Sequence, residues 1–273
     1  MPEKPEVMTV AKTLDKIIVG KRIKSVDVLW DNIIVGEIKE FKKKIKNQKV
    51  EKITTRGKFI VIFLTSYALL IHLRMEGKFF FRKKGDEINK HEHVIFRFDD
   101  NSEMRYHDVR KFGKIQLVDK LKLYDIAPLN KLGYDYYDKD LTESYLKEAY
   151  KKINKPIKSV LLDQSIIAGI GNIYADEILF RSKLNPYLEA KRLSIKDCTN
   201  IVKYTKEILD AAEKKGGTTI KSFTSSEGVH GLFQNELSVH GQKVCPICNN
   251  TLIKEFIGGR GTYYCKKCQK KKN

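Results

Sequence analysis

The segment CPICNNTLIKEFIGGRGTYYCKKC, residues 245–268, determines how the last part of this chain folds. Two Cys-x2-Cys pairs lie 16 residues apart, and this spacing is typical of a tetrahedral zinc site. Four thiolates fill all coordination positions and leave none for a substrate water. The segment therefore predicts a structural zinc ion held by Cys245, Cys248, Cys265 and Cys268.

The spacer between the cysteine pairs is typical of a β-hairpin with a basic tip. Gly258 and Gly259 supply a tight turn directly before Arg260. From Lys243 to Asn273 there are eight Lys or Arg residues and one acid, Glu255. We expect Arg260 to contact a phosphate, and the alternative is a solvated turn arginine. Cys198 lies outside the cluster and is expected to be a small packed residue.

The charge of the whole chain favours a polyanionic partner. It has 273 residues, enough for more than one core, with 53 Lys and Arg against 34 Asp and Glu, a net charge of +19. Lysines that neutralise phosphates release counterions, so such an imbalance is typical of nucleic-acid binding. A general basic bias from an A+T-rich coding sequence is the alternative.

The hydrophobic pattern argues against a membrane or secreted protein. No run approaches 18 apolar residues, and Glu3, Lys4 and Glu6 precede the first apolar segment. Four of the five cysteines cluster near one end, which fits a metal site in a reducing compartment better than a disulfide framework. We therefore expect a cytosolic protein.

Met1-Pro2-Glu3 carries the candidate chemistry. Removal of Met1 exposes a secondary amine at Pro2, and an α-amine titrates near about 8, so a useful fraction is neutral and nucleophilic. Its condensation with a sugar C1′ gives an iminium ion without an N–H, and this cation favours elimination of phosphate. Glu3 is placed to transfer protons. The alternative is a Pro2 that occurs by chance.

Hydrophobic periodicity divides the rest of the chain. Residues 5–19 have the spacing of an amphipathic helix, and residues 22–118 contain short β-rich runs that suggest a sandwich or barrel. After about Gly133 the pattern becomes helical, with N-caps expected at Asp140 and Ser194. Residues 170–174 resemble a helix start suited to an anion. Residues 216–231 are typical of a linker and mobile loop, and the last module begins near Phe233.

Several motifs along the chain resemble the formamidopyrimidine-DNA glycosylase family. They are Met1-Pro-Glu-Lys-Pro-Glu-Val7, Arg56-Gly-Lys58, His72-Leu-Arg-Met75-Glu-Gly77, Asp108-Val-Arg110-Lys-Phe112-Gly113, Leu162-Asp-Gln164 through Gly171-Asn172-Ile173-Tyr174-Ala175, Gly216-Gly-Thr-Thr219 and Gly259-Arg260-Gly-Thr-Tyr-Tyr-Cys265.

The resemblance implies a role for each matching residue. The catalytic set is Pro2 as nucleophile, Glu3 as its acid-base partner and Lys58 at the lesion and phosphate. Residues that match the family's lesion-recognition positions are Glu6, Lys158, Thr218 and Thr219. Those that fill the gap left by the everted base are Met75, Arg110 and Phe112. DNA-binding residues are His72, Arg110, Asn172 and Arg260.

The resemblance also implies a multidomain α+β fold. An N-terminal catalytic β-sandwich with flanking helices (1–133) precedes a helix-two-turn-helix domain (134–225) and a zinc β-hairpin (226–273), and DNA lies across the cleft. The implied activity is a monomeric, bifunctional DNA glycosylase and AP lyase in base excision repair. It removes 8-oxoguanine opposite cytosine and formamidopyrimidines from double-stranded DNA, acts on AP sites and cleaves by β,δ-elimination. The expected location is the bacterial cytoplasm at the nucleoid.

Two rival functions stay open at this point. The related endonuclease VIII branch shares Pro2, Glu3 and the zinc hairpin but prefers oxidised pyrimidines. A catalytically silent protein that binds damaged DNA needs none of the proposed catalytic residues. The chain also departs from the family, which commonly has glycine at Arg74, proline at Val109, a second arginine at Lys111 and a Gly-Pro-Glu-Pro turn at residues 132–135.

Overall fold

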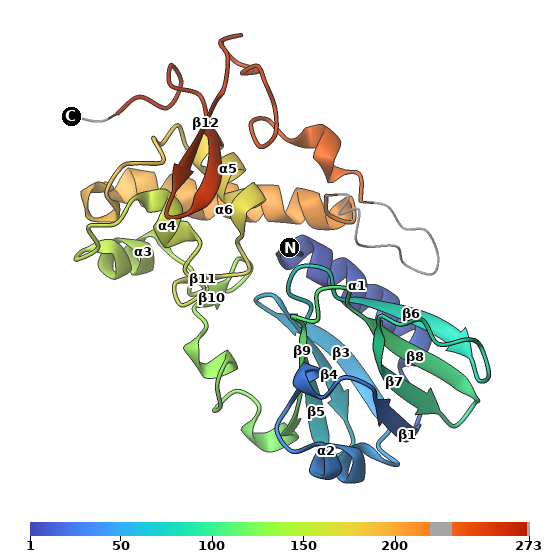
Figure 1. Cartoon of the computed structure of the whole chain (residues 1–273). Helices are drawn as coiled ribbons and strands as arrows, with labels where there is room; N and C mark the ends of the chain where they lie inside the picture. Colours follow the sequence, from blue (N-terminus) through green and yellow to red (C-terminus); the bar gives the residue numbers. More distant parts are fainter. Residues whose placement is uncertain (219–230, 272–273) are drawn as a thin grey trace. The chain divides into compact units, whose positions relative to one another are not determined.

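A computed structural model describes residues 1–218 and 231–271. The chain forms two compact units (Figure 1). Unit 1 comprises Met1–Asn130 and Gly216–Gly231, and unit 2 comprises Lys131–Lys215 and Leu232–Asn273. Among the described residues, no helix is long and apolar enough to cross a bilayer.

Unit 1 begins with α1 and continues into two antiparallel-rich sheets (Figure 1). The four-stranded sheet has the order β1-β7-β8-β6, and the five-stranded sheet has the order β2-β9-β5-β4-β3. The elements are α1 (Lys4–Ile18), β1 (Ile23–Val28), β2 (Ile34–Val35), α2 (Ile38–Ile45), β3 (Val50–Arg56), β4 (Phe59–Leu64), β5 (Tyr67–His72), β6 (Lys78–Lys83), β7 (Glu92–Phe98), β8 (Ser102–His107) and β9 (Lys114–Asp119), with 3-10 turns at Asp31–Ile33, Lys120–Lys122 and Leu129–Lys131.

One hydrophobic core joins the two sheets and both helices. Alternate residues of the strands enter it, such as Ile60 and Ile62 of β4 and Phe96 and Phe98 of β7. Helix α1 adds its apolar face, including Leu14, at the i, i+3, i+4 spacing that its sequence shows. This shared core makes unit 1 a sandwich with flanking helices, and both loops that follow β5 and β8 start from its buried strands.

Unit 2 is mainly helical. Its elements are β10 (Tyr134–Asp135), α3 (Glu143–Tyr150), α4 (Ile157–Leu161), β11 (Ile167–Ala168), α5 (Asn172–Arg181), α6 (Ile195–Lys214), β12 (Ile253–Ile257) and β13 (Arg260–Tyr264), with 3-10 turns at Ala190–Arg192 and Phe233–Glu236. Cys198 is fully buried in α6, as expected for a packed thiol.

The N-caps of unit 2 confirm one prediction and correct another. Ser194 and Asp197 form a capping box at the start of α6. The prediction of Asp140 as the cap of α3 is wrong, because Thr142 directly precedes the helix and its side chain accepts a hydrogen bond from Tyr145 N at 3.1 Å. A cap must lie next to the first turn to reach its free N–H groups, and Asp140 lies two residues too early.

Strands β12 and β13 form the predicted hairpin, drawn in red in Figure 1. Ile257 pairs with Arg260, so Gly258 and Gly259 are the only loop residues. Both glycines have positive φ, 56° and 74°, as a two-residue turn of the I′ type requires. Arg260 is therefore placed at the start of β13, where it is exposed.

Candidate functional site

The first turn of α1 fixes the candidate catalytic residues of unit 1. Pro2 lies directly before Glu3, which is the N-cap of the helix. Glu3 and Glu6 form a capping box, in which Glu6 Oε2 accepts a hydrogen bond from Glu3 N at 2.9 Å. Both carboxylates are almost fully buried, Glu3 being 2% exposed. Negative charge at this position is also favoured by the helix dipole.

The other oxygen of Glu6 holds the start of residues 218–231. Glu6 Oε1 accepts hydrogen bonds from Thr218 N at 2.8 Å and Thr218 Oγ1 at 3.2 Å. Gly217 has φ +81°, and a Cβ there would lie 2.6 Å from the same carboxylate oxygen. Glu6 thus connects Glu3 to Thr218. The predicted lesion-recognition residue Thr219 and the loop 219–230 lie outside the described residues.

Lys58 occupies a tight turn in the five-stranded sheet. Arg56 of β3 pairs with Phe59 of β4, so Gly57 and Lys58 form the whole connection. Gly57 has φ +53°, which a residue with a side chain rarely adopts. Lys58 is only 6% exposed. A short turn between two long paired strands fixes its backbone rigidly.

His72, the predicted phosphate ligand, ends β5 as a neutral ring. Burial, and then the positive charges of Arg74 and Lys58, lower the pKa of His72 to about 3. Its Nδ1 accepts a hydrogen bond from Arg74 N at 3.0 Å. Because an accepting ring nitrogen carries no proton, the proton of the neutral ring is on Nε2. His72 is therefore prepared to donate one hydrogen bond at neutral pH.

We expect His72 to reduce stability at acid pH. Its folded pKa of about 3 lies below the ordinary 6.5, so the unfolded chain takes up a proton that the folded chain refuses. The free energy of unfolding then decreases as the pH falls from about 6.5 towards 3, at most by about 1.4 kcal/mol per pH unit. His72→Gln keeps a donor without titrating. Urea midpoints at pH 7, 6 and 5 should fall less steeply in this variant, and equal slopes would refute the assignment.

The three predicted gap-filling residues lie on two loops that share a buried support. Met75 lies between β5 and β6, whereas Arg110 and Phe112 lie between β8 and β9. Tyr106 is fully buried between the loops, and a Cβ at Gly77 or Gly113 would lie 2.2 or 1.6 Å from its hydroxyl oxygen. Only glycine fits at these two positions.

Asp108 fixes the second of these loops. This fully buried carboxylate accepts hydrogen bonds from Arg110 N at 3.0 Å and Gly113 N at 2.8 Å. The guanidinium carbon of Arg110 lies 4.9 Å from the ring centroid of Phe112, and Phe112 is 51% exposed. The loop thus presents a cationic donor group and an exposed apolar ring side by side.

Gly113→Ala is expected to destabilise unit 1 by about 2 kcal/mol or more, because the new Cβ displaces Tyr106. Tyr106→Phe removes the hydroxyl oxygen that the new Cβ meets first. The double variant should therefore recover part of the lost stability. Gly261→Ala is a matched control, since its Cβ meets only Lys254 at 3.6 Å. Chemical denaturation measures the four variants Gly113→Ala, Tyr106→Phe, their combination and Gly261→Ala beside the wild type. Equal losses for Gly113→Ala and Gly261→Ala would contradict this packing.

In unit 2, the predicted DNA-binding residues Asn172 and Arg260 lie on adjoining segments. Asn172 begins α5, and its Nδ2 donates a hydrogen bond to Gly261 O at 2.8 Å. Gly261 directly follows Arg260 on β13. The start of α5 and the tip of the hairpin are therefore joined, and N–H groups at a helix start suit a phosphate.

Lys158 is buried beneath this junction. Its Nζ donates hydrogen bonds to Asn172 O at 2.8 Å and to Asp176 Oδ1 at 2.6 Å. The side chains of Lys158 and Asp176 are both fully buried. These contacts place the lysine where it supports the first turn of α5. A buried pair of this kind tolerates the loss of one partner poorly.

Asp176 and Glu177 are structural residues that the sequence reasoning missed. Asp176 Oδ2 lies 2.7 Å from His240 Nδ1 and accepts a hydrogen bond from Tyr263 N at 3.2 Å. Glu177 accepts backbone N–H groups of Ser238, Val239 and His240 at 2.8 to 2.9 Å. Two adjacent acids on a helix that is otherwise mostly apolar were the available signal.

The four predicted zinc ligands converge. All four Sγ atoms lie within 4.8 Å of one another. The Sγ atoms of Cys245 and Cys268 are 3.8 Å apart, and those of Cys248 and Cys265 are 3.5 Å apart. Zn–S bonds of about 2.3 Å in a tetrahedron require sulfur atoms about 3.8 Å apart. The donor set and its size therefore fit one structural zinc ion.

Three family models match the chain in order. They describe a formamidopyrimidine-DNA glycosylase N-terminal domain (residues 1–115), the H2TH domain of the same enzymes (132–224) and a zinc finger found in FPG and IleRS (242–271). The chain belongs to the formamidopyrimidine-DNA glycosylase family. Membership confirms the predicted fold, with its N-terminal, helix-two-turn-helix and zinc-finger parts, and one structural zinc.

Curated relatives and solved structures support the same family membership. A formamidopyrimidine-DNA glycosylase of Bacillus cereus is 43% identical over 98% of this chain and 99% of its own length. The formamidopyrimidine-DNA glycosylase of Oceanobacillus iheyensis is 41% identical over 100% of this chain and 99% of its own length. A complex of Lactococcus lactis Fpg with DNA containing an abasic site has a TM-score of 0.92 at 34% identity, covering 98% of this chain and 100% of that one. A mutant of the same enzyme with Fapy-dG DNA gives 0.93 at 33%, covering 99% and 100%.

Two departures from the formamidopyrimidine-DNA glycosylase pattern coincide with unusual backbone. Arg74 and Lys111 have φ values of 54° and 58°. The left-handed region favours glycine, which the family commonly has at position 74. Both residues flank the predicted gap-filling side chains, Arg74 beside Met75 and Lys111 between Arg110 and Phe112. Arg74 therefore places a cationic side chain where the family commonly has glycine, whereas Lys111 replaces one cationic side chain with another.

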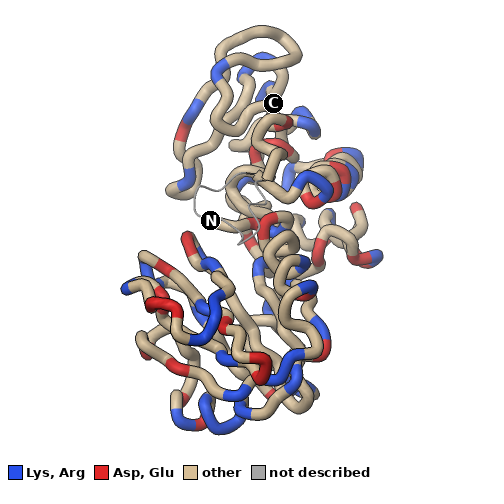
Figure 2. Tube along the Cα trace, turned by 90° about the vertical axis from the view of Figure 1, so that its right-hand side faces the viewer, with Lys and Arg blue, Asp and Glu red and all other residues tan. Residues whose placement is uncertain are grey.

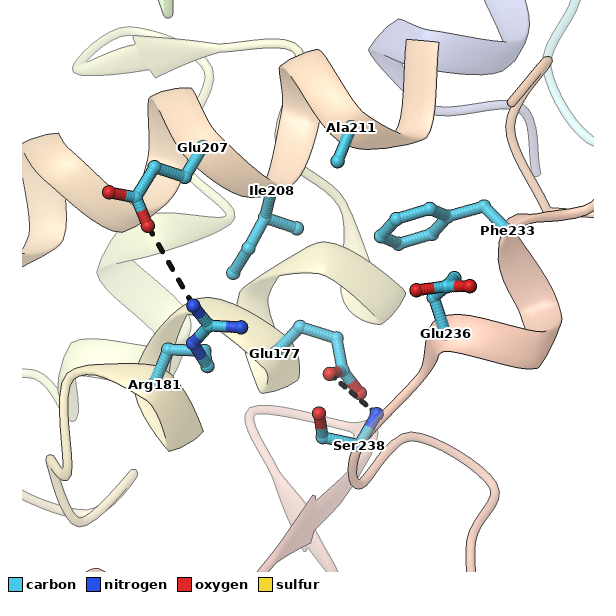
Figure 3. Close-up of a pocket in the computed structure, with 8 residues that line it drawn as sticks. All are labelled: Glu177, Arg181, Glu207, Ile208, Ala211, Phe233, Glu236 and Ser238. Carbon is cyan, nitrogen blue, oxygen red and sulfur yellow. Dashed lines mark hydrogen bonds and ion pairs between the residues drawn. The ribbon is translucent and has the colours of Figure 1, made fainter. Parts of the chain in front are cut away.

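A separate pocket in unit 2, of about 190 Å³, includes none of the predicted site residues. Figure 3 shows Arg181 directed at Glu207, 3.7 Å away, and Glu177 bound to Ser238. Glu236 also lines this pocket and pairs with Lys215 at 2.5 Å. Its carboxylates thus have partners within the protein. Figure 2 shows Lys and Arg distributed over both units.

Proposed function

We propose that this base excision repair enzyme removes oxidised purines from double-stranded DNA and then cleaves the strand at the resulting AP site. Its preferred lesions are 8-oxoguanine opposite cytosine and formamidopyrimidines. The observation that carries the proposal is the position of Pro2, directly before the buried N-cap Glu3 at the start of α1. Relatives named formamidopyrimidine-DNA glycosylase match over the whole chain and support it.

The chemistry begins once Met1 is removed. The Pro2 nitrogen attacks C1′ of the damaged nucleotide, the C1′–N bond breaks, and the base leaves with a proton delivered through Glu3. The Pro2 nitrogen then loses its proton, and the C1′–O4′ bond breaks as O4′ takes up a proton. The opened sugar is an iminium ion that has no N–H to lose. Loss of a C2′ proton expels the 3′ phosphate by β-elimination, and a δ-elimination then expels the 5′ phosphate. Lys58 assists at the lesion and its phosphate.

Base eversion supplies the geometry for this attack. An enzyme amine cannot reach C1′ of a stacked nucleotide, so the nucleotide is flipped at a cost of a few kcal/mol. Met75 and Phe112 fill the gap as apolar wedges, and Arg110 donates hydrogen bonds to the orphaned cytosine. Tyr106 and Asp108 support this role, because they fix both loops before DNA binds.

Lesion recognition and DNA binding use the remaining residues. Glu6, Thr218 and Thr219 are assigned to recognition of the everted base. Lys158 is assigned to lesion recognition as well, and it acts by supporting the first turn of α5. His72 donates Nε2–H to a phosphate, and Asn172 and Arg260 bind further phosphates.

We also propose the domain boundaries 1–133, 134–225 and 226–273, and a location in the bacterial cytoplasm at the nucleoid, where the DNA substrate lies.

A duplex panel tests the proposal. Each duplex carries one lesion, which is 8-oxoguanine, formamidopyrimidine or dihydrouracil. The purine lesions are placed opposite either cytosine or adenine. We expect single-turnover excision to be fastest for the two purine lesions opposite cytosine, with β,δ-elimination products. Faster excision of dihydrouracil would transfer the chain to the endonuclease VIII branch. Binding without excision would leave a silent damage-binding protein.

A further inference from the structure

Trp30, the only tryptophan of the chain, lies against the loop that carries Arg110 and Phe112. The Lys111 ammonium nitrogen is 3.7 Å from the centroid of the Trp30 ring. An ammonium group at this distance over an indole face makes a strong cation–π contact. Trp30 is nevertheless 38% exposed, so core packing does not fully explain its presence.

Lys111 needs such a support because of its backbone. It has φ 58°, and a lysine persists in the left-handed region only when its surroundings fix it there. The hydrogen bond from Lys111 N to Asp108 O, 3.2 Å long, secures one side of the residue. The Trp30 ring secures its side chain. The turn at Lys111 sets the directions in which its neighbours Arg110 and Phe112 leave the loop.

The segment around Trp30 is itself firmly attached to the loop's base. Leu29 N donates a hydrogen bond to His93 O at 2.8 Å, and the His93 ring donates from Nε2 to Asp108 O at 2.9 Å. On the other side of Trp30, the Lys114 ammonium binds Asn32 O. Strand β2 then pairs in parallel with β9, with Ile34 opposite Ile115. Residues 29–35 therefore form a fixed platform beside residues 108–115.

We propose that Trp30 is a positioning residue for base eversion. Through its contact with Lys111 it holds the loop 108–113 in the conformation in which Arg110 and Phe112 are ready to enter the gap. This inference rests on the proposed function of those two residues. It adds Trp30 and Lys111 as a pair whose effect is on the speed and opposite-base selectivity of excision.

The contact can be measured without DNA, because all indole fluorescence comes from Trp30. Lys111→Met removes the ammonium group and keeps the apolar stem, and it should change the intensity and maximum of the emission. Lys203→Met is the matched control, since it removes an ammonium group 5.6 Å from the ring of Tyr204 in unit 2. That variant should leave the Trp30 emission unchanged. Unchanged emission in Lys111→Met would overturn the contact.

A double-mutant cycle then tests the effect on excision. Trp30→Leu and Lys111→Met should each slow single-turnover excision of 8-oxoguanine about two- to fivefold and reduce the preference for cytosine over adenine. The double variant should be no slower than either, and Trp30→Phe, which keeps a ring, should be intermediate. Thermal unfolding of each variant separates a folding defect from the effect on the loop.

The outcomes distinguish this inference from the proposed function. Additive effects in the cycle, or rates and selectivity equal to wild type, would overturn the role of Trp30 while excision by the wild type upholds the enzyme. No excision by the wild type on any lesion would instead refute the proposed function, and with it the positioning role. Non-additive rates with changed selectivity support the inference.

Discussion

Glu3→Gln is expected to slow excision of 8-oxoguanine by about 10²- to 10⁴-fold, the usual contribution of a positioned acid-base group. Glutamine has nearly the shape of glutamate and still accepts hydrogen bonds, but it does not transfer a proton. Glu3 is 2% exposed and caps α1 beside Pro2, so bulk water does not readily replace it. Single-turnover kinetics on a duplex with 8-oxoguanine opposite cytosine measures the change.

The same variant separates excision from covalent chemistry. On DNA with a preformed AP site, the sugar aldehyde already offers C1′, so Pro2 should still form a borohydride-reducible adduct. Thermal unfolding should remain near that of the wild type, because Glu6 Oε2 binds the backbone N–H of residue 3 in both proteins. Excision at the wild-type rate in Glu3→Gln would remove Glu3 from the catalytic set.

Loss of zinc is expected to have the second large effect. Apparent zinc-binding free energies of roughly 10–16 kcal/mol in zinc-finger peptides are also folding free energies. Cys245→Ala should therefore release the metal and unfold the segment 245–268. Arg260 then loses its fixed position at the hairpin, and DNA affinity should fall about tenfold or more for damaged and undamaged duplexes alike. Fluorescence anisotropy with labelled duplexes measures it.

Cys198→Ala is the matched control for this experiment. It removes a buried thiol of α6 that is not a ligand, so zinc content measured by atomic absorption should remain one per chain. The salt dependence of binding gives a second reading, since loss of one phosphate contact lowers its slope by about one. Unchanged affinity in Cys245→Ala after verified zinc loss would contradict the role of the hairpin.

Local sequence patterns predicted the parts of this fold that depend on nearby residues. The spacing of the cysteine pairs predicted the zinc site, and Gly258-Gly259 predicted the hairpin turn that the structure shows. The amphipathic pattern predicted α1, and the Ser194 cap is confirmed as well. In each case, contacts between residues close in sequence decide the conformation.

Contacts between distant residues were not predictable in the same way. The pairing of Asp176 with Lys158 and with His240 joins segments 18 and 64 residues apart. Tyr106 lies against two glycines, Gly77 and Gly113, and the sequence motifs that contain them do not reveal this contact. The chemistry of an exposed α-amine suggested Pro2 and Glu3, but the family resemblance was needed to assign their roles. The roles of the gap-filling residues came from the resemblance alone, because composition and spacing do not distinguish them from surface residues.

The most direct test of the central claim is borohydride trapping. The purified protein, with loss of Met1 confirmed by mass spectrometry, is incubated with a duplex that contains 8-oxoguanine opposite cytosine and is then reduced. A dihydrouracil duplex is treated in parallel. We predict a covalent adduct that peptide mapping assigns to Pro2 and that forms faster on the purine lesion. An adduct at Lys58 or another lysine, or intact binding with no adduct, would contradict the account.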